Sequence, residues 1–186
     1  MGLTEWAYSL SEAMLSEPLP RRWAHSLGVA KRARSLSPIL GADAELLEAA
    51  AVLHDVGYSP AIATTGFHPL DGARFLRGQE GADERVVRLV AHHSCALLEA
   101  EERGLRRELE GEFELERPDL VDALLYCDMT TTPDGTATTP TARLDEILKR
   151  YGPDTIVGRF IQRASPEIYA ASERVESRLV LVSADD

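Results

Sequence analysis

The sequence contains little cysteine, and it has no stretch that resembles an export signal or a membrane span. Cys95 and Cys127 are the two cysteines among 186 residues, which argues against a disulfide framework and a cysteine-rich structural zinc site. The first residues lack the basic start and unbroken apolar core of a signal peptide, and no window approaches the roughly 18 apolar residues of a membrane span. We therefore expect a reduced, cytoplasmic protein without a membrane partner.

Basic residues are outnumbered by acidic ones. The chain has 20 lysines and arginines against 31 aspartates and glutamates, a formal net charge of -11. Such a charge opposes binding to long DNA or RNA by general electrostatics. A small phosphorylated substrate remains compatible with it, because a bound dication would dominate the field around the phosphate.

Strand-like alternation, internal repeats and long heptad runs are also missing. Apolar residues instead recur at helical spacing along most of the chain, which predicts an all-α fold in one domain, residues 1–186. The predicted helices cover about residues 4–15, 20–37, 43–55, 82–94, 118–128 and 141–151, with another beginning at His68-Pro69 and two more in 154–182, separated near Ser165-Pro166. We expect the charged stretch 97–117 to be a solvated excursion without a chemical role; a lid over the site and a partner surface are the alternatives.

An apolar helical run, Ala49 to Leu53, ends abruptly in the adjacent pair His54 and Asp55. Burying an imidazole beside a carboxylate is costly unless the two groups bond to each other or bind a cation. The pair alone fits either a His–Asp hydrogen bond at a helix end or one part of a metal site. Other ligands in the chain would decide between these interpretations.

Helical spacing indicates such ligands. The remaining histidines are His25, His68, His92 and His93, each beside a predicted helix. His25 continues the apolar face of its helix, and Asp128 follows leucines and a valine at helical spacing, which places a carboxylate on an apolar face. Imidazoles and carboxylates together suit divalent ions such as manganese, iron, zinc, cobalt or nickel.

The order of these residues resembles the signature of the HD superfamily of metal-dependent phosphohydrolases: His25, then His54-Asp55, then Asp128. The resemblance covers about residues 20–130 and implies a helical bundle with a metal site in its core, which the C-terminal helices of 131–186 complete. Two further histidines between the doublet and the last aspartate are similar to the two-metal branch of the superfamily. His68, together with His92 or His93, occupies those places.

The resemblance implies a role for each ligand. Asp55 would bridge two ions, with His25, His54 and Asp128 holding one ion and His68, with His92 or His93, holding the other. The apolar stripe of the helix extends to His93, whereas relatives with a single histidine align their ligand with the first of the pair; we rank His92 first and keep both. His54 and Asp55 are then the catalytic centre, where two ions would clamp and activate a bridging hydroxide.

Candidate substrate contacts lie beside these ligands. Many relatives carry a lysine after the glycine of the doublet segment, but here Tyr58 takes its place, and its hydroxyl could donate a hydrogen bond to a substrate oxygen. The other candidates are Arg21 and Arg22 before His25, Arg77 or Arg74 after His68, and Thr131 and Thr132 in the loop after Asp128. Each of them also fits a solvated or capping role.

The expected function is hydrolysis of a small phosphate ester, a nucleotide or dinucleotide. Relatives with the same ligand pattern include diiron oxygenases that oxidise a small alcohol or an organophosphonate, and the missing lysine favours this alternative slightly. A non-catalytic nucleotide-binding module is a second alternative. The last third of the chain has no histidine and no acidic cluster, so we expect it to serve packing or a homodimer contact.

Overall fold

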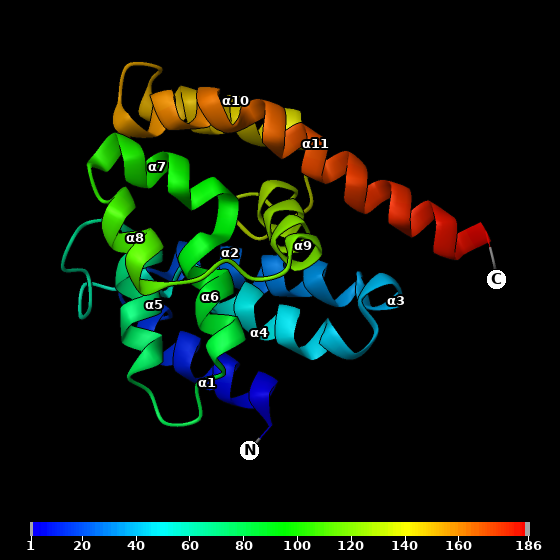
Figure 1. Cartoon of the computed structure of the whole chain (residues 1–186), viewed down its shortest axis with the longest axis horizontal. Coiled ribbons are helices and arrows are strands. Elements are labelled where there is room, and N and C mark those ends of the chain that lie inside the picture. The colour runs from blue at the N-terminus through cyan, green and yellow to red at the C-terminus, as the bar shows by residue number, and fades with distance from the viewer. Residues whose placement is uncertain (1, 185–186) are drawn as a thin grey trace.

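The regular structure of residues 2–184, which the computed structural model describes, is helical apart from one isolated bridge between Thr131 and Ala137 (Figure 1). The predicted all-α class is confirmed. The α-helices are α1 (Leu3–Leu15), α2 (Pro20–Arg34), α3 (Ser37–Leu40), α4 (Ala44–Leu53), α5 (His68–Arg77), α6 (Glu84–His92), α7 (Ala96–Arg103), α8 (Arg106–Glu112), α9 (Pro118–Met129), α10 (Pro140–Tyr151) and α11 (Ile156–Ala184). Short 3-10 turns are η1 (Gly41–Asp43), η2 (Val56–Tyr58) and η3 (His93–Cys95).

The central helix is α4, in which Leu46, Leu47 and the run from Ala49 to Leu53 are buried. It packs against α1, α2, α6 and α9. The small side chains of Ala49, Ala50 and Ala51 are fully buried and let the neighbouring helices approach closely. A helical segment that is apolar all round, as Ala49 to Leu53 is, belongs in a core, so the C-terminal end of α4 delivers His54 and Asp55 to the interior of the bundle.

A glycine contact joins α2 to the loop that follows α9. A Cβ atom added at Gly28 of α2 would lie 2.4 Å from the carbonyl oxygen of Gly135. Gly135 itself has a φ of +80°, a left-handed conformation that favours glycine. The close approach brings the loop after Asp128 against the helix that carries His25.

The C-terminal helices lie across one side of the bundle (Figure 1). The predicted break near Ser165-Pro166 is wrong, because α11 is continuous from Ile156 to Ala184 with Pro166 inside it. Ile161, Ala164, Ile168 and Ala171 lie on both sides of this proline and pack in one core cluster with residues of α9 and α10. Packing on both sides therefore outweighs the lost backbone hydrogen bond and the steric cost of an internal proline, about 3 kcal/mol.

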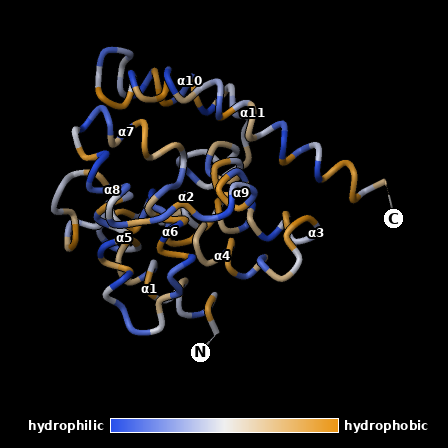
Figure 2. Tube along the Cα trace, in the orientation of Figure 1, coloured by the Kyte–Doolittle hydropathy of each residue, from blue (hydrophilic) through white to orange (hydrophobic). Residues whose placement is uncertain are grey.

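The charged stretch 97–117 is more ordered than its composition predicts. It forms most of α7 and all of α8, and Leu109 and Phe113 are buried in the main core. Its charges pair with neighbours, as in the bonds from Arg74 to Glu108 and Glu112. Figure 2 shows hydrophilic and hydrophobic residues interleaved along the outer helices. No helix within residues 2–184 is long and apolar enough to cross a membrane.

Candidate metal centre

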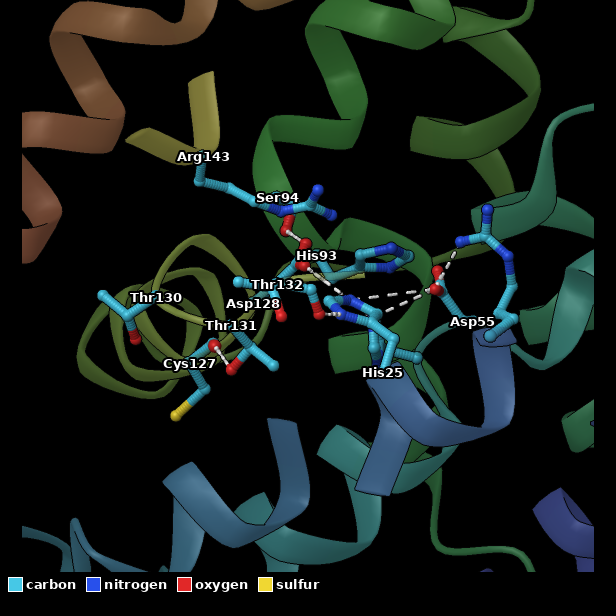
Figure 3. A network of polar contacts seen from close by, with 12 residues as sticks. His25, Asp55, His93, Ser94, Cys127, Asp128, Thr130, Thr131, Thr132 and Arg143 are labelled. Carbon is cyan, nitrogen blue, oxygen red and sulfur yellow. Dashed lines mark hydrogen bonds and ion pairs between the residues drawn. The ribbon is translucent and has the colours of Figure 1, made fainter. Parts of the chain in front are cut away.

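Six of the predicted ligands converge at the centre of the bundle. His25, His54 and Asp128 form one group, and Asp55, His68 and His93 form a second. Within each group the candidate ligand atoms lie within 4.8 Å of one another. The side chains come from α2, α5, α9 and the turns that follow α4 and α6, and Figure 3 shows His25, Asp55, His93 and Asp128 directed toward a common point.

The first group is oriented by the polypeptide backbone. His54 Nδ1 donates to the carbonyl oxygen of Ala51 at 2.7 Å, and its Nε2, fully buried, has no hydrogen-bond partner. His25 Nδ1 donates to the carbonyl oxygen of Thr132 at 2.9 Å, which leaves its Nε2 3.0 Å from Oδ1 of Asp128. A backbone carbonyl on Nδ1 fixes the orientation of each ring and directs its Nε2 into the centre, as is usual for histidines that bind metals.

The second group follows the same rule. His93 Nδ1 donates to the carbonyl oxygen of Val90 at 2.6 Å, and its Nε2 lies 3.0 Å from Nε2 of His68. The ring of His68 stacks on that of Tyr58, with centroids 3.9 Å apart. The chain also fits tightly here, since a Cβ atom at Gly57 would lie 2.0 Å from the carbonyl oxygen of His68.

Asp55 lies between the two groups. Its Oδ2 is 3.5 Å from Nε2 of His54 and 4.0 Å from Nε2 of His25, while its Oδ1 is 3.4 Å from Nε2 of His68. Arg22 Nη1 donates to Oδ2 at 2.6 Å. Each oxygen of this carboxylate thus faces a different group, which is the position a bridging ligand requires.

The charge states in this centre suit cation binding. Burial would raise the pKa of the Asp55 carboxyl, but Arg22 and His54 hold that pKa well below its ordinary value. Burial also raises the pKa of Asp128, but the hydrogen bond from His25 and the nearby His54 and Arg143 together lower it. Burial lowers the pKa values of His68 and His93 and keeps both rings neutral. Ionised carboxylates and neutral imidazoles are the forms that coordinate metals.

The donor set therefore fits divalent cations. The buried Nε2 of His54, which has no hydrogen-bond partner, is an unfavourable arrangement that a bound cation would relieve. All six donors are nitrogen or carboxylate oxygen, the mixture that suits zinc, iron, manganese and similar ions.

The family model described as HD domain matches residues 22–164, most of the chain. The protein belongs to the HD domain family. Ribonuclease Y of Rubrobacter xylanophilus is 40% identical to it over 70 residues, which are 38% of this chain and 14% of the ribonuclease. This chain therefore matches only a small part of the length of that relative. No solved structure matches it.

One candidate ligand lies apart in this HD domain. His92 belongs to neither group, because its Nε2 donates to the carbonyl oxygen of Phe113 at 2.8 Å. The ranking of His92 ahead of His93 is corrected by this geometry. α6 ends at His92, and the next residue turns inward to direct His93 at the metal centre.

The candidate substrate residues separate into two sets. Arg22 and Tyr58 line the central cavity, where the Arg22 guanidinium lies 3.5 Å above the centre of the Tyr58 ring. The structure places Arg77 apart from them: it pairs with Glu84, stacks on Phe113 and lines neither of the two cavities near the metal centre.

The remaining candidates do not touch the central cavity. Arg21 is exposed and makes a bidentate ion pair with Asp134. The Thr131 hydroxyl donates to the carbonyl oxygen of Cys127 at 2.8 Å, so it caps its own helix. Thr132 contributes its backbone carbonyl to His25 rather than its hydroxyl to the cavity.

Ser94 is a site residue that sequence reasoning missed. Its hydroxyl donates to Oδ2 of Asp128 at 2.5 Å (Figure 3). Both Ser94 and the following Cys95 are left-handed, with φ of 49° and 61°, and these two residues bend the chain sharply between α6 and α7. Non-glycine residues avoid this conformation, so the sequence carried no signal for it.

Arg143 and Tyr151 were also missed, because they lie on α10, beyond the signature residues. Both line the central cavity, which has a volume of about 90 Å³ and reaches from the metal centre to apolar residues of α10 and α11. A local pattern cannot indicate them, since only the folding of α10 over the bundle brings them to the site.

Proposed function

We propose that this HD domain is a metal-dependent phosphohydrolase that acts on a small phosphate ester of the nucleotide or dinucleotide class. One observation carries the proposal: Asp55 lies between two groups of His and Asp ligands, beside a cavity that arginines line. Two dications held there would supply Lewis-acid stabilisation of phosphoryl charge and lower the pKa of an attacking water.

The protein side chains have distinct tasks in this proposal. His25, His54 and Asp128 would hold one ion, His68 and His93 would hold the other, and Asp55 would contribute to both. Ser94 positions Asp128, and backbone carbonyls keep the histidine rings in place.

Arg22 and Tyr58 form the wall nearest the second group. The Tyr58 ring lies between the Arg22 guanidinium and the His68 ring, at 3.5 and 3.9 Å. This stack supports His68 and holds Arg22 against Asp55. Arg22 would then also face the phosphoryl oxygens, a task for which the planar guanidinium is well suited.

A small substrate agrees with the size and charge of the protein. A cavity of about 90 Å³ has room for a phosphoryl group and little more. The net charge of -11 disfavours long RNA or DNA. The partial similarity to a ribonuclease supports chemistry at a phosphate ester, without extending its polymeric substrate to this chain.

The test begins with protein purified without chelator. Its metal content is measured, and phosphate release is then followed on a panel of nucleotides and dinucleotides with and without oxygen. We expect about two divalent ions per chain and phosphate release that needs no oxygen. His54→Ala and Asp55→Ala should lose both the metal and the activity, while a control variant that removes a surface charge, Arg163→Gln, should keep both.

Other outcomes would contradict the proposal in distinguishable ways. Two irons with oxygen uptake and no phosphate release would assign the protein to the diiron oxygenases. Bound metal without turnover of any compound would assign it to the non-catalytic nucleotide-binding proteins. Full activity in Asp55→Ala would remove the metal centre from the reaction.

A further inference from the structure

A second cavity adjoins the metal cavity. It has a volume of about 310 Å³, and the two cavities share four lining residues, namely Arg22, His25, Arg143 and Arg150. The remainder of its wall consists of Pro18, Leu19, Pro20, Arg21 and Pro133. A molecule whose phosphoryl group lies in the smaller cavity would therefore extend past Arg143 and Arg150 into a larger space with a mainly apolar wall.

The arginines around this passage are not equally neutralised. Arg21 has its own carboxylate in Asp134, and Arg22 has Asp55. Arg143 and Arg150 instead share the single carboxylate of Glu146.

Arg143 is the more constrained of this pair. It is only 9% exposed, and its Nε is buried without a hydrogen-bond partner. In Figure 3 its side chain extends from α10 toward Ser94 and the metal centre. A buried guanidinium with an unused donor is costly unless an anion binds it. Two guanidinium groups thus share one ion-paired carboxylate at the boundary of the two cavities, in a protein that is acidic overall.

We propose that Arg143 and Arg150 form a second anion subsite, and that the substrate carries a second anionic group on the portion that leaves. This inference rests on the proposed function and narrows its substrate to a phosphate ester whose departing alcohol bears a phosphate or a carboxylate. Hydrolysis would join the oxygen of water to phosphorus, break the ester P–O bond and leave a proton on the alcohol, which stays held by its own anion.

The apolar residues of the second cavity fit the remainder of such a leaving group. Pro18, Leu19, Pro20 and Pro133 offer flat, rigid surfaces without hydrogen-bond donors. A ring or a similar apolar body would pack on these prolines while its anion bonds to Arg143 or Arg150. The subsite thus selects for charge at one end of the leaving group and for apolar contact along its body.

Binding of pairs of compounds that differ only in the second anion tests this subsite. Phenylphosphonate is compared with 4-carboxyphenylphosphonate, and a nucleoside 5′-monophosphate with its 3′,5′-bisphosphate, by calorimetry on the metal-loaded protein. We expect the doubly anionic member to bind about tenfold more tightly or better, as a charge-assisted hydrogen bond to arginine provides. The pair in which the second anion improves the affinity more shows whether the subsite prefers a carboxylate or a phosphate.

Arg143→Gln and Arg150→Gln should each reduce the preference for the doubly anionic compound to less than about threefold. The affinity for the singly anionic compounds should change little. Arg163→Gln, which removes an equal charge from an exposed part of α11, serves as the control. Because Arg143 is buried, thermal unfolding of its variant is measured in parallel, and Arg150→Gln carries the test if the Arg143 variant does not fold.

The outcomes separate the subsite from the reaction. Equal binding of both members by the wild type, or a preference that survives both substitutions, overturns the subsite even if every ester is hydrolysed. A preference that Arg143→Gln or Arg150→Gln abolishes, without phosphate release from any compound, supports the subsite and overturns the hydrolase.

Discussion

The Nε2 atoms of His68 and His93 lie 3.0 Å apart in the interior of the protein, and Nδ1 of His93 is engaged by the carbonyl oxygen of Val90. The Nε2 of His93 therefore presents a lone pair toward a second imidazole nitrogen. A cation between the two rings would bind both Nε2 atoms. A proton on Nε2 of His68, donated to Nε2 of His93, would also satisfy both nitrogens. This relationship distinguishes His93 from the adjacent His92, whose ring donates to Phe113 instead.

Replacing each of these neighbours should have a different effect. His93→Ala should lose about one of two bound ions and at least about tenfold in activity, since even partners of metal ligands contribute this much. His92→Ala should keep both ions and lose about 1–3 kcal/mol of unfolding free energy, because the carbonyl of Phe113 is left without its donor. Elemental analysis and urea denaturation measure the two quantities. Metal loss confined to the His92 variant would reverse the assignment.

Ser94 should influence the metal through Asp128. Removing the hydroxyl in Ser94→Ala should lower metal affinity about 10–100-fold, because the carboxylate loses the bond that orients it. Ser94→Gly removes the same hydroxyl but relieves the positive φ, a strain of about 1 kcal/mol or more. We expect the glycine variant to bind metal as weakly as the alanine variant and to unfold at a higher temperature than the alanine variant. Metal affinity at the wild-type level in both would separate Ser94 from the site.

Asp71 organises the loop that leads to His68. Its buried carboxylate accepts hydrogen bonds from the backbone or hydroxyls of Thr64, Thr65 and Gly66. Asp71→Ala should cost on the order of 3 kcal/mol in unfolding free energy, because these donors lose a charged acceptor. It should also weaken the second ion more than the first, since His68 begins the helix after this loop.

Asp83→Ala provides a matched control for this variant. Asp83 caps α6 through the backbone N–H of Arg85 at 2.7 Å, and its loss should cost about 1 kcal/mol without affecting metal. Calorimetric metal titration compares the two variants. Equal binding of both ions by the Asp71 variant would show that the loop does not position His68.

Acid should destabilise the protein after its metal has been removed by a chelator. His68 and His93 have lowered pKa values in the folded protein, so below about pH 6.5 the unfolded chain takes up protons that the folded one does not. Their contribution to stability is present above that pH and is lost as the pH falls. Asp55, whose pKa is also lowered, extends this loss below about pH 4. His25 opposes the trend: burial lowers its pKa, but the hydrogen bond with Asp128 and the charges of Asp128 and Asp55 together raise it.

The melting temperature of the chelated protein should accordingly fall between about pH 7 and pH 5. His93→Gln, which removes one of these titrating groups, should make the decline shallower. Asp83→Ala should leave the slope unchanged. A melting temperature that rises toward pH 5 would contradict the charge states described for the centre.

Much of the helical frame follows from local pattern. The apolar run before His54 and Asp55, the proline after His68 and the apolar face that carries Asp128 predicted helices that α4, α5 and α9 confirm. Such patterns are reliable because the helical period and the preference of proline for a first turn act within a few residues. The same helical spacing indicated which imidazoles and carboxylates lie on the apolar faces of these helices.

Tertiary structure decided the features that depend on distant contacts. The apolar stripe of its helix already favoured His93, but its separation from His92 follows from the end of α6 at His92 and the extended backbone of His93. α11 stays helical through Pro166 because its two halves share one packed face. Arg143 reaches the site only because α10 folds back over the bundle. The sequence by itself determined which groups are available and which faces are apolar, since those are local properties. Which groups meet was decided by packing between segments far apart in the chain, whose geometry no local period encodes.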